Sequence, residues 1–237
     1  MKVLGIDSSG MVASVAVVED DILLAEYTVN YKKTHSQTLL SMLSEIGDMI
    51  SLDLNSLDAI AVAAGPGSFT GLRIGSATAK GLGLALDKPI IPVPTVDGLA
   101  YDLWGTDKIV CPLMDARRNQ VYTGIYEFGD GKLQILEKQM AVAITEIAEK
   151  LNVLGREVIF LGDGVPVYRE MLAEVMKVPY SFAPAHMNRQ RASAVAVLGA
   201  QYYAQGRVES AMEHKPDYLR LSQAERERKE REEQNRA

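Results

Sequence analysis

The chain is organised around residues 61–75, Ala-Val-Ala-Ala-Gly-Pro-Gly-Ser-Phe-Thr-Gly-Leu-Arg-Ile-Gly. The apolar run from Ile60 to Ala64 has the length and composition of a buried strand. Gly-Pro-Gly at 65–67 then breaks the run, because glycine permits backbone angles closed to other residues and proline cannot extend a ladder. Residues 71–86 follow with the pattern of a helix. The stretch therefore predicts a strand, a tight turn and a helix in succession.

The predicted helix carries a row of small residues on one side. The row has a spacing of four and consists of Gly71, Gly75, Ala79 and Gly83. Each interior glycine lowers helix stability by roughly 1 kcal/mol relative to alanine. The row therefore suggests that another backbone approaches closely. That backbone belongs either to a neighbouring strand of this chain or to a helix of another protein.

Composition limits the classes of protein to consider. A chain of 237 residues with a net charge of -6 does not predict a broad electrostatic grip on nucleic acid. The single cysteine, Cys111, excludes an internal disulfide and fits a reducing compartment. Apolar runs stay well below the roughly 18 residues that span a bilayer. We therefore expect a cytoplasmic α/β protein without a membrane segment.

Hydrophobic periodicity predicts that the chain contains the same order of elements twice. The first half predicts βββαβαβα, with elements at 3–6, 12–18, 22–29, 37–50, 57–64, 71–86, 89–93 and 95–104. The second half predicts elements at 109–115, 121–128, 133–142, 145–151, 158–161, 165–175 and 192–205. The repeated βββαβα order predicts two related lobes, residues 1–104 and 105–220, followed by a charged tail at 221–237.

An aspartate ends the first strand of each predicted lobe. Asp7 and Asp115 would lie at the tips of the first hairpins, where they could orient a metal–phosphate or a water across a cleft. Alternatively, each aspartate accepts hydrogen bonds from its own turn. The neighbouring Arg117 and Arg118 could bind phosphate or pair with Asp115. The sequence leaves these readings open.

Two glycine-rich loops are candidate phosphate sites. Gly65 and Gly67 precede one predicted helix, and Gly162 and Gly164 precede another. Free N–H groups at a helix start can bind an anion. Neither loop matches a nucleotide fingerprint, so a tight strand-to-helix turn is an equal alternative. We treat Asp7, Asp115 and these four glycines as a candidate vestigial nucleotide site.

Metal and hydrolase signatures are missing from the sequence. The three histidines form no i, i+4 pair, and there is no Cys-x-x-Cys or H-E-x-x-H motif. The G-x-S-x-G motif of many hydrolases is also missing. We therefore predict no metal ligands and no catalytic residues.

The predicted helix 37–50 is apolar over more than a narrow stripe. Its large apolar residues include Leu39, Leu43 and Ile46. Beside the small-residue helix 71–86, such a pattern is typical of a helix-mediated protein interface. Burial within the chain is the alternative, and the sequence does not decide between them.

Four segments together resemble the TsaB family of bacterial tRNA threonylcarbamoyladenosine biosynthesis proteins. The segments are Leu4–Ser9, Thr34–Leu40, Ala63–Gly75 and Met114–Tyr122. The resemblance extends over residues 1 to about 220, and its most specific parts lie in the third and fourth segments, Gly-Pro-Gly-Ser-Phe-Thr-Gly and Asp-Ala-Arg-Arg. It implies the two-lobed fold shared by actin, hexokinase and Hsp70 (ASKHA, RNase H-like).

The resemblance also implies a partner role. The related catalytic subunit TsaD holds a metal through an H-x-x-x-H motif, whereas the corresponding residues 94–100 here contain no histidine. The family pairs with TsaD and, with the ATPase TsaE, enables threonylcarbamoyl transfer to adenosine 37 of tRNA. We place the contact on helices 37–50 and 71–86, through Leu39, Leu43, Ile46, Gly71, Gly75, Ala79 and Gly83.

Several expectations accompany this role. We expect no tightly bound cofactor, with ATP or ADP and Mg bound weakly or shared at the subunit contact. Contact with tRNA would be indirect, and the isolated chain could form a homodimer through the same surface. The alternatives are a stand-alone kinase or ATPase of the same fold and a metallopeptidase-like protein.

Overall fold

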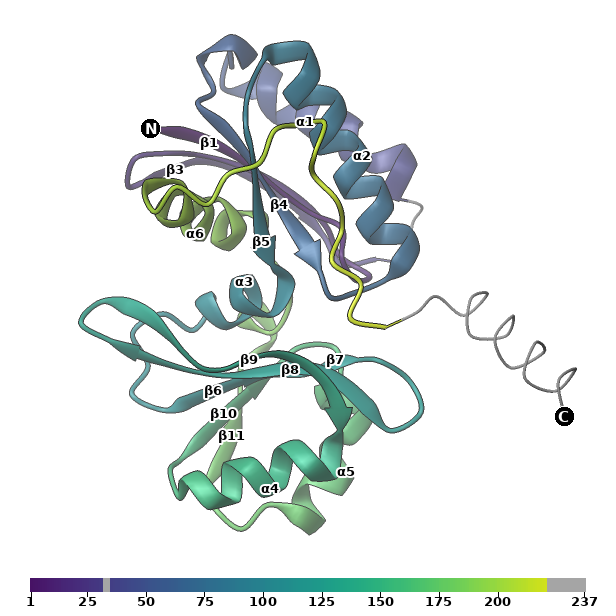
Figure 1. Cartoon of the computed structure of the whole chain (residues 1–237), viewed down its shortest axis with the longest axis vertical. Helices are drawn as coiled ribbons and strands as arrows, with labels where there is room; N and C mark the ends of the chain where they lie inside the picture. The colour runs from purple at the N-terminus through teal and green to yellow at the C-terminus, as the bar shows by residue number, and fades with distance from the viewer. Residues whose placement is uncertain (32–34, 221–237) are drawn as a thin grey trace, which may run out of the picture.

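Residues 1–31 and 35–220 are described by a computed structural model in which two α/β lobes face each other (Figure 1). The predicted charged tail at 221–237 lies outside the described residues, as does Thr34 of the second resemblance segment.

The first lobe is built on a five-stranded sheet of order β3-β2-β1-β4-β5. The strands are β1 (Lys2–Asp7), β2 (Ala13–Glu19), β3 (Ile22–Val29), β4 (Ala59–Gly65) and β5 (Ile90–Pro94). Strands β1, β2 and β3 form an antiparallel meander, and β1, β4 and β5 are parallel. Helices α1 (His35–Met49) and α2 (Phe69–Leu86) cover one face, and the short η1 (Leu54–Ser56) precedes β4. None of the helices in the described ranges combines the length and apolar character needed to cross a membrane.

The second lobe repeats this topology. Its strands are β6 (Ile109–Pro112), β7 (Met114–Asp115), β8 (Gln120–Gly129), β9 (Lys132–Ala143), β10 (Val158–Leu161) and β11 (Tyr180–Phe182). Strand β8 pairs antiparallel with both β6 and β9, and β6, β10 and β11 are parallel. The order β9-β8-β6-β10-β11 therefore matches β3-β2-β1-β4-β5 of the first lobe, with β7 as an additional short strand on β8. Helices α4 (Ile144–Leu154) and α5 (Val165–Val175) cover one face, and η2 (Ala185–Met187) follows β11. The predicted duplication is confirmed.

Two helices cross from one lobe to the other, which corrects the predicted lobe boundaries. Helix α3 (Thr95–Tyr101) packs on the second sheet, through Val96 and Leu99. Helix α6 (Ala192–Ala204) packs on the first sheet, although it follows the second lobe in sequence (Figure 1). The split at 104/105 and the end of the second lobe at 220 therefore do not match the packing. Both helices are buried over most of their surface, so their sequences do not say which sheet they cover.

Strand β4 reads as a continuous apolar run because both of its faces are covered. Every residue of β4 is buried. Ile60 and Val62 pack with α1 and α2, while Ala61 and Ala63 pack with α6. The alanines on the α6 side leave room for close approach, since a Cβ on Gly199 of α6 would lie 2.6 Å from the Ala61 side chain.

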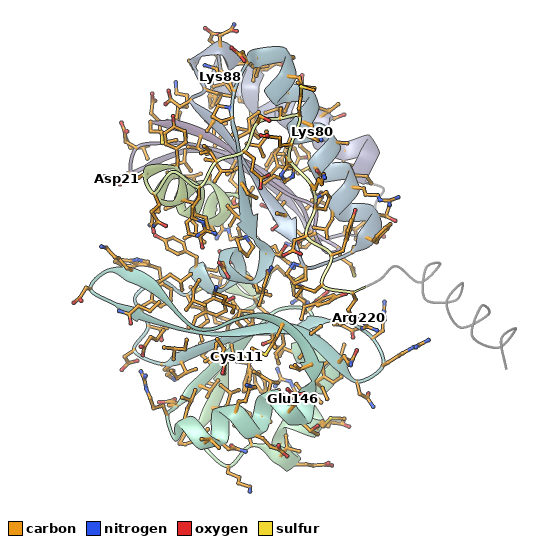
Figure 2. The ribbon with its side chains drawn as sticks, in the orientation of Figure 1. Asp21, Lys80, Lys88, Cys111, Glu146 and Arg220 are labelled. Atoms are coloured by element: carbon orange, nitrogen blue, oxygen red, sulfur yellow. The ribbon has the colours of Figure 1, made fainter. Side chains whose placement is uncertain are left out.

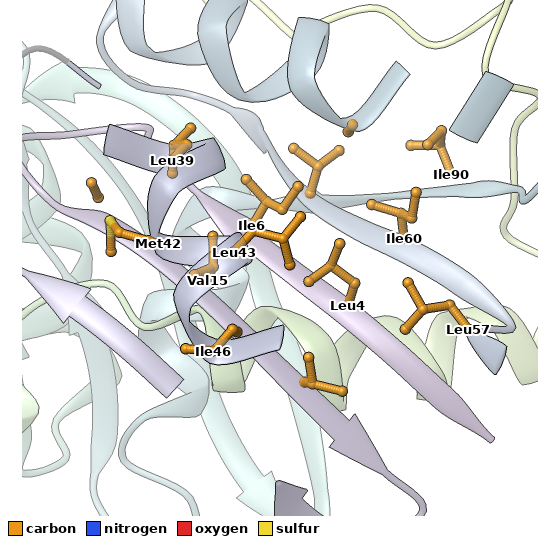
Figure 3. Close-up of a cluster of buried hydrophobic side chains, with 14 of the residues drawn as sticks. Leu4, Ile6, Val15, Leu39, Met42, Leu43, Ile46, Leu57, Ile60 and Ile90 are labelled. Atoms are coloured by element: carbon orange, nitrogen blue, oxygen red, sulfur yellow. The ribbon is translucent and has the colours of Figure 1, made fainter. Parts of the chain in front are cut away.

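The apolar face of α1 is buried within the chain. Leu39, Leu43 and Ile46 are all less than a tenth exposed and pack against β1, β2 and β4 (Figure 3). The prediction that these three side chains form a partner interface is wrong, and burial within the chain is correct for them. The physical reason is that a sheet facing water on this side would expose Leu4, Ile6 and Ile60, which these side chains cover.

The row of small residues on α2 also faces inward. A Cβ on Gly71 would overlap the carbonyl oxygen of Ser8, and one on Gly75 would overlap the Ser8 hydroxyl. Ala79 and Gly83 are buried in the same face. The backbone that approaches closely therefore belongs to the turn between β1 and β2, and the row is not a contact surface for another protein.

Most predicted elements form within a few residues of their expected bounds, with two exceptions. The expected strand 109–115 is split into β6 and β7 at Leu113. Its N–H still donates to Leu161 of β10, but its carbonyl accepts from Gly164, in the loop after β10. The sequence also missed β11, which has only three residues and pairs at the sheet edge. Neither exception alters the order of the duplicated topology.

Two glycine substitutions in α2 should have opposite effects on stability. We expect Gly71→Ala to lower the free energy of unfolding by about 1–3 kcal/mol, because the new Cβ overlaps the Ser8 carbonyl. Gly81→Ala is the matched control, since nothing lies within 4 Å of its Cβ position, and it should raise stability by up to about 1 kcal/mol. Urea unfolding measures both, and equal effects would contradict the packing described for Gly71.

Candidate functional site

A cleft of about 500 Å³ lies between the lobes, where the carboxyl ends of β1, β4 and β7 meet. In open α/β sheets this is the edge where ligands bind. The lining comes from the turns after these strands, from the start of α2 and from the segment before residue 221: Ser9, Gly10, Met11, Gly67, Ser68, Phe69, Thr70, Leu72, Met114, Asp115, Ala116, Arg117, Tyr122, Asp163, Asp217, Tyr218, Leu219 and Arg220.

Asp7 is buried beneath the turn that it precedes. Its Oδ1 accepts hydrogen bonds from the backbone N–H of Ser9 at 2.8 Å and from the Ser9 hydroxyl at 2.7 Å. Ser9 lines the cleft, whereas Asp7 is not among the lining residues. The carboxylate therefore orders the turn, as expected for an aspartate that bonds to the backbone two residues on.

Asp115 lines the cleft but is bonded by its own lobe. Its Oδ1 accepts from the Arg117 N–H at 2.8 Å and from the Tyr168 hydroxyl at 3.0 Å, and its Oδ2 pairs with the Arg117 guanidinium at 3.2 Å. Burial, followed by the hydrogen bond to this carboxylate, raises the pKa of Tyr168 to about 12. Tyr168 therefore stays protonated and acts as a donor to Asp115. These contacts hold the turn at 117–119, in which all three residues have positive φ.

The second carboxylate in the cleft is Asp163, which the sequence analysis did not select as a site residue. Its Oδ1 accepts from the backbone N–H of Asp115 at 3.1 Å. Burial raises the pKa of Asp163, and the hydrogen bond from Asp115 opposes this shift. The cleft thus brings Asp115 and Asp163 together, rather than Asp7 and Asp115. The position of Asp163 between two glycines in the loop that follows β10 was the signal that could have identified it.

The glycines of both candidate phosphate loops accommodate backbone carbonyls. A Cβ on Gly67 would overlap the carbonyl of Ser9, which already accepts the N–H of Ser68 at 2.6 Å. A Cβ on Gly65, whose φ is +128°, would overlap the carbonyl of Asp217. These glycines therefore permit close packing of the chain on itself.

The loop of the second lobe uses its glycines in the same way. Cβ atoms on Gly162 and Gly164 would meet the carbonyl of Leu113. The N–H of Gly164 donates to that carbonyl at 2.8 Å, and the N–H of Gly162 donates to Asn188 Oδ1 at 2.7 Å. Anion binding at a loop needs free N–H groups. Here the N–H groups of Ser68, Gly162 and Gly164 already have protein acceptors, which favours the tight-turn alternative at these positions.

Residues 94–100, which the resemblance aligns with the metal ligands of TsaD, form the hinge between the lobes. Asp97 on α3 accepts hydrogen bonds from the hydroxyls of Tyr126 at 2.7 Å and Tyr202 at 2.8 Å, which come from β8 and α6. Burial raises the pKa of Asp97, and the two tyrosine hydrogen bonds oppose the shift. Within the described residues, no group of three histidine, cysteine or acidic side chains is arranged to hold a metal ion.

A second hollow lies on the outer side of α1 and α2, away from the interlobe cleft. This outer groove has a volume of about 510 Å³ and is lined by Leu40, Leu43, Ser44, Gly47, Asp48, Ser51, Leu52, Leu54 and Leu82. Of its lining residues, Leu40 is 57% exposed; Met49 and Leu84 are also exposed on α1 and α2 but do not line the groove. The exposed side of α2 also carries small residues spaced by four, Ala77, Gly81 and Ala85. The residues selected from the sequence, such as Leu43 and Gly75, lie on or next to the buried sides of these two helices.

The duplicated sheets and the cleft between them define the class of protein. The chain has the two-lobed fold of the actin, hexokinase and Hsp70 group. A ROK hexokinase from Thermus thermophilus superposes with a TM-score of 0.50 at 14% identity, covering 87% of this chain and 100% of the hexokinase chain. At this identity the likeness concerns the fold alone.

Closer relatives identify the family. The tRNA threonylcarbamoyladenosine biosynthesis protein TsaB of Bacillus subtilis is 34% identical over 227 residues, which are 95% of this chain and 96% of that protein. A Pseudomonas aeruginosa protein described as similar to peptidase YeaZ has a TM-score of 0.79 at 27% identity, over 92% of this chain and 99% of that one. The model of the TsaD family, tRNA N6-adenosine threonylcarbamoyltransferase, matches residues 23–228. The chain belongs to the TsaB family, which confirms the resemblance.

Removing the charge of Asp97 should change how stability depends on pH. Burial raises the pKa of Asp97 in the folded chain above its usual 3.8. The stability that the protonated Asp97 side chain contributes is therefore fully present below pH 3.8, and it is lost as the pH rises through the folded pKa. Asp97→Asn should therefore gain stability relative to wild type between pH 3.5 and 7, by about 1.4 kcal/mol per unit of raised pKa.

Urea unfolding across this pH range measures the effect. Asp107→Asn is the control, because it also removes one negative charge but lies on an exposed loop. Parallel stability curves for wild type and Asp97→Asn would show that the carboxyl does not titrate differently on folding.

Proposed function

We propose that this chain is a non-catalytic partner subunit in the synthesis of N6-threonylcarbamoyladenosine at position 37 of tRNA. It pairs with TsaD, and TsaE joins the pair as the ATPase. Membership of the TsaB family supports this role, because the Bacillus subtilis relative is a tRNA threonylcarbamoyladenosine biosynthesis protein. The protein would act in the cytoplasm, with tRNA contacted through TsaD.

The hydrogen bonding of the cleft supports an absence of catalysis by this chain. Asp115 is bonded to Arg117 and Tyr168, and Asp163 is bonded to the backbone of Asp115. A catalytic carboxylate must reach a substrate or a water, and these two are committed to the turns that carry them. In the loops that would hold phosphate, three N–H groups are bonded within the chain, to Ser9, Leu113 and Asn188.

The outer groove of α1 and α2 is the observation that carries the proposal. Leu40 exposes a large apolar side chain in a hollow that no other part of the described chain covers, and Met49 and Leu84 expose others elsewhere on the same two helices. The exposed side of α2 carries Ala77, Gly81 and Ala85, which allow a second helix to approach at the short interaxial distances of packed helices. We assign this side of the two helices to TsaD. In isolation, two copies of the chain would pair through it.

The proposed contact with TsaD also bears on nucleotide binding. We propose that the chain holds no tightly bound cofactor, and that ATP or ADP with Mg binds weakly or at the contact with TsaD. Calorimetry with ATP and magnesium separates this from a stand-alone kinase or ATPase, which would bind at micromolar concentration and turn over ATP. Casein digestion with chelator controls tests the metallopeptidase-like alternative on the same preparation.

A reconstituted reaction tests the function directly. The purified chain is mixed with TsaD from the same organism and analysed by size-exclusion chromatography with light scattering. Addition of TsaE, the carbamoyl-adenylate-forming enzyme, threonine, bicarbonate, ATP and unmodified tRNA then allows modified adenosine to be assayed. We expect a complex and a modification that requires this chain, and modification of equal extent without it would refute the proposal.

Charged residues on the outer groove should prevent pairing. We expect Leu40→Glu combined with Ala85→Glu to weaken TsaD binding by roughly 30-fold or more, because an exposed apolar contact and a position of close helix approach become charges in a desolvated interface. Val153→Glu is the control, since Val153 is 87% exposed on the second lobe. Circular dichroism checks folding, and tight TsaD binding by a folded double variant would exclude this surface.

A further inference from the structure

After α6 the chain returns along the first lobe to the cleft. The N–H and carbonyl of Glu209 bond Ile90 at 2.9 Å in both directions, which places the segment beside β5. Lys80 of α2 then donates to the carbonyls of Met212 at 3.1 Å and His214 at 2.9 Å. Figure 1 shows this segment, in yellow, passing over β5 and α2 and ending between the lobes. It delivers residues 217–220, here called the strap, into the interlobe cleft.

The strap is bonded to the first lobe through its backbone. The N–H of Asp217 donates to the carbonyl of Ala64 at 2.6 Å, at the end of β4. The Asp217 carbonyl occupies the space that a side chain on Gly65 would need. The glycine that ends β4 is therefore required for the strap to lie against the strand.

An aromatic stack anchors the strap to α2. The Tyr218 ring stacks on Phe69 with centroids 4.5 Å apart. Arg73, one turn further along α2, places its guanidinium 4.1 Å from the Phe69 centroid and donates from Nε to the Tyr218 hydroxyl at 3.3 Å. Offset aromatic pairs and cation–π contacts of this kind each favour one geometry. The start of α2 thus forms a fitted seat for Tyr218.

Two further strap contacts reach the second lobe. Gln139 of β9 donates to Asp217 Oδ2 at 2.6 Å. The Arg220 guanidinium donates to the carbonyl of Ala116 at 2.5 Å, in the turn that follows β7. Figure 2 places Arg220 at the level where the two lobes meet. Three of the four strap residues, Asp217, Tyr218 and Arg220, therefore connect the strap to the two walls of the cleft.

We propose that the interlobe cleft is a binding site for this chain's own residues 217–220, and that the occupied site fixes the two lobes at one separation. The ligand is a peptide segment with a tyrosine for the Phe69–Arg73 seat, a backbone N–H for β4 and an arginine for the second lobe. Related two-lobed folds can open and close around a hinge. Here the strap connects the first lobe to the second, so the two lobes stay at one separation without any added ligand.

Distance measurements on the full chain test this proposal. Asp21→Cys and Glu146→Cys place spin labels on exposed sites of the first and second lobes (Figure 2). Cys111 stays unlabelled, because it is buried and its pKa is raised to about 12 by that burial. Hydrogen exchange at the Asp217 amide reports strap release in the same background.

Tyr218→Ala should release the strap. We expect the interlobe distance distribution to broaden and exchange at the Asp217 amide to rise about ten-fold, the effect of losing an aromatic pair. Tyr218→Phe keeps the stack and loses the bond from Arg73, so an intermediate effect is expected from a variant that is close to isosteric. Tyr203→Ala is the matched control, since Tyr203 is 40% exposed and Tyr218 is 37% exposed.

The outcomes are distinct. Broadening with Tyr218→Ala, a smaller change with Tyr218→Phe and none with Tyr203→Ala support the strap. Phe69→Ala tests the other ring of the stack and should reproduce the effect of Tyr218→Ala. Wild-type distances and exchange in both Tyr218→Ala and Phe69→Ala, with native circular dichroism, would overturn the proposal. None of these variants alters the outer groove, so TsaD binding can be measured separately.

Discussion

The structure depends on close backbone contact between the β1–β2 turn and the start of α2. The carbonyls of Ser8 and Ser9 lie against Gly71 and Gly67, where any Cβ would overlap them, and the Ser8 hydroxyl donates to the Gly71 carbonyl at 2.8 Å. The second lobe repeats the arrangement, with the Leu113 carbonyl against its own glycine loop. Because only glycine fits such contacts, each lobe becomes one rigid unit of hairpin, strand and helix.

This contact also determines how the cleft is used. In the glycine loops, the N–H groups of Ser68, Gly162 and Gly164 donate to acceptors within the chain. The carboxylate of Asp115 accepts hydrogen bonds from Arg117 and Tyr168. The cleft is then free to hold the chain's own strap, with Tyr218 on Phe69. With the strap in the cleft, the two lobes are held at one separation, and the outer surfaces of the chain keep one arrangement.

The connection between the lobes is polar at its centre and apolar around it. Asp97 joins α3 to Tyr126 of the second sheet and to Tyr202 of α6. Since α3 packs on the second sheet and α6 on the first, this one carboxylate connects both crossing helices. A buried carboxylate with raised pKa is tolerated because two hydroxyls donate to it. The hinge and the strap lie in different parts of the interface and act on the same lobe separation.

The sequence by itself determined the duplicated topology, the glycine-rich turn and the helices of the outer groove, because periodicity and turn chemistry are local properties. Tertiary structure alone decided which side of a helix is exposed: Gly71 and Leu39 face the core, while Gly81 and Leu40 face outward. Both sides of α2 carry small residues, so spacing could not distinguish them. Likewise, Asp163 and Tyr218 reach the cleft from distant segments, and only the packing of α6 on the first sheet brings the strap there.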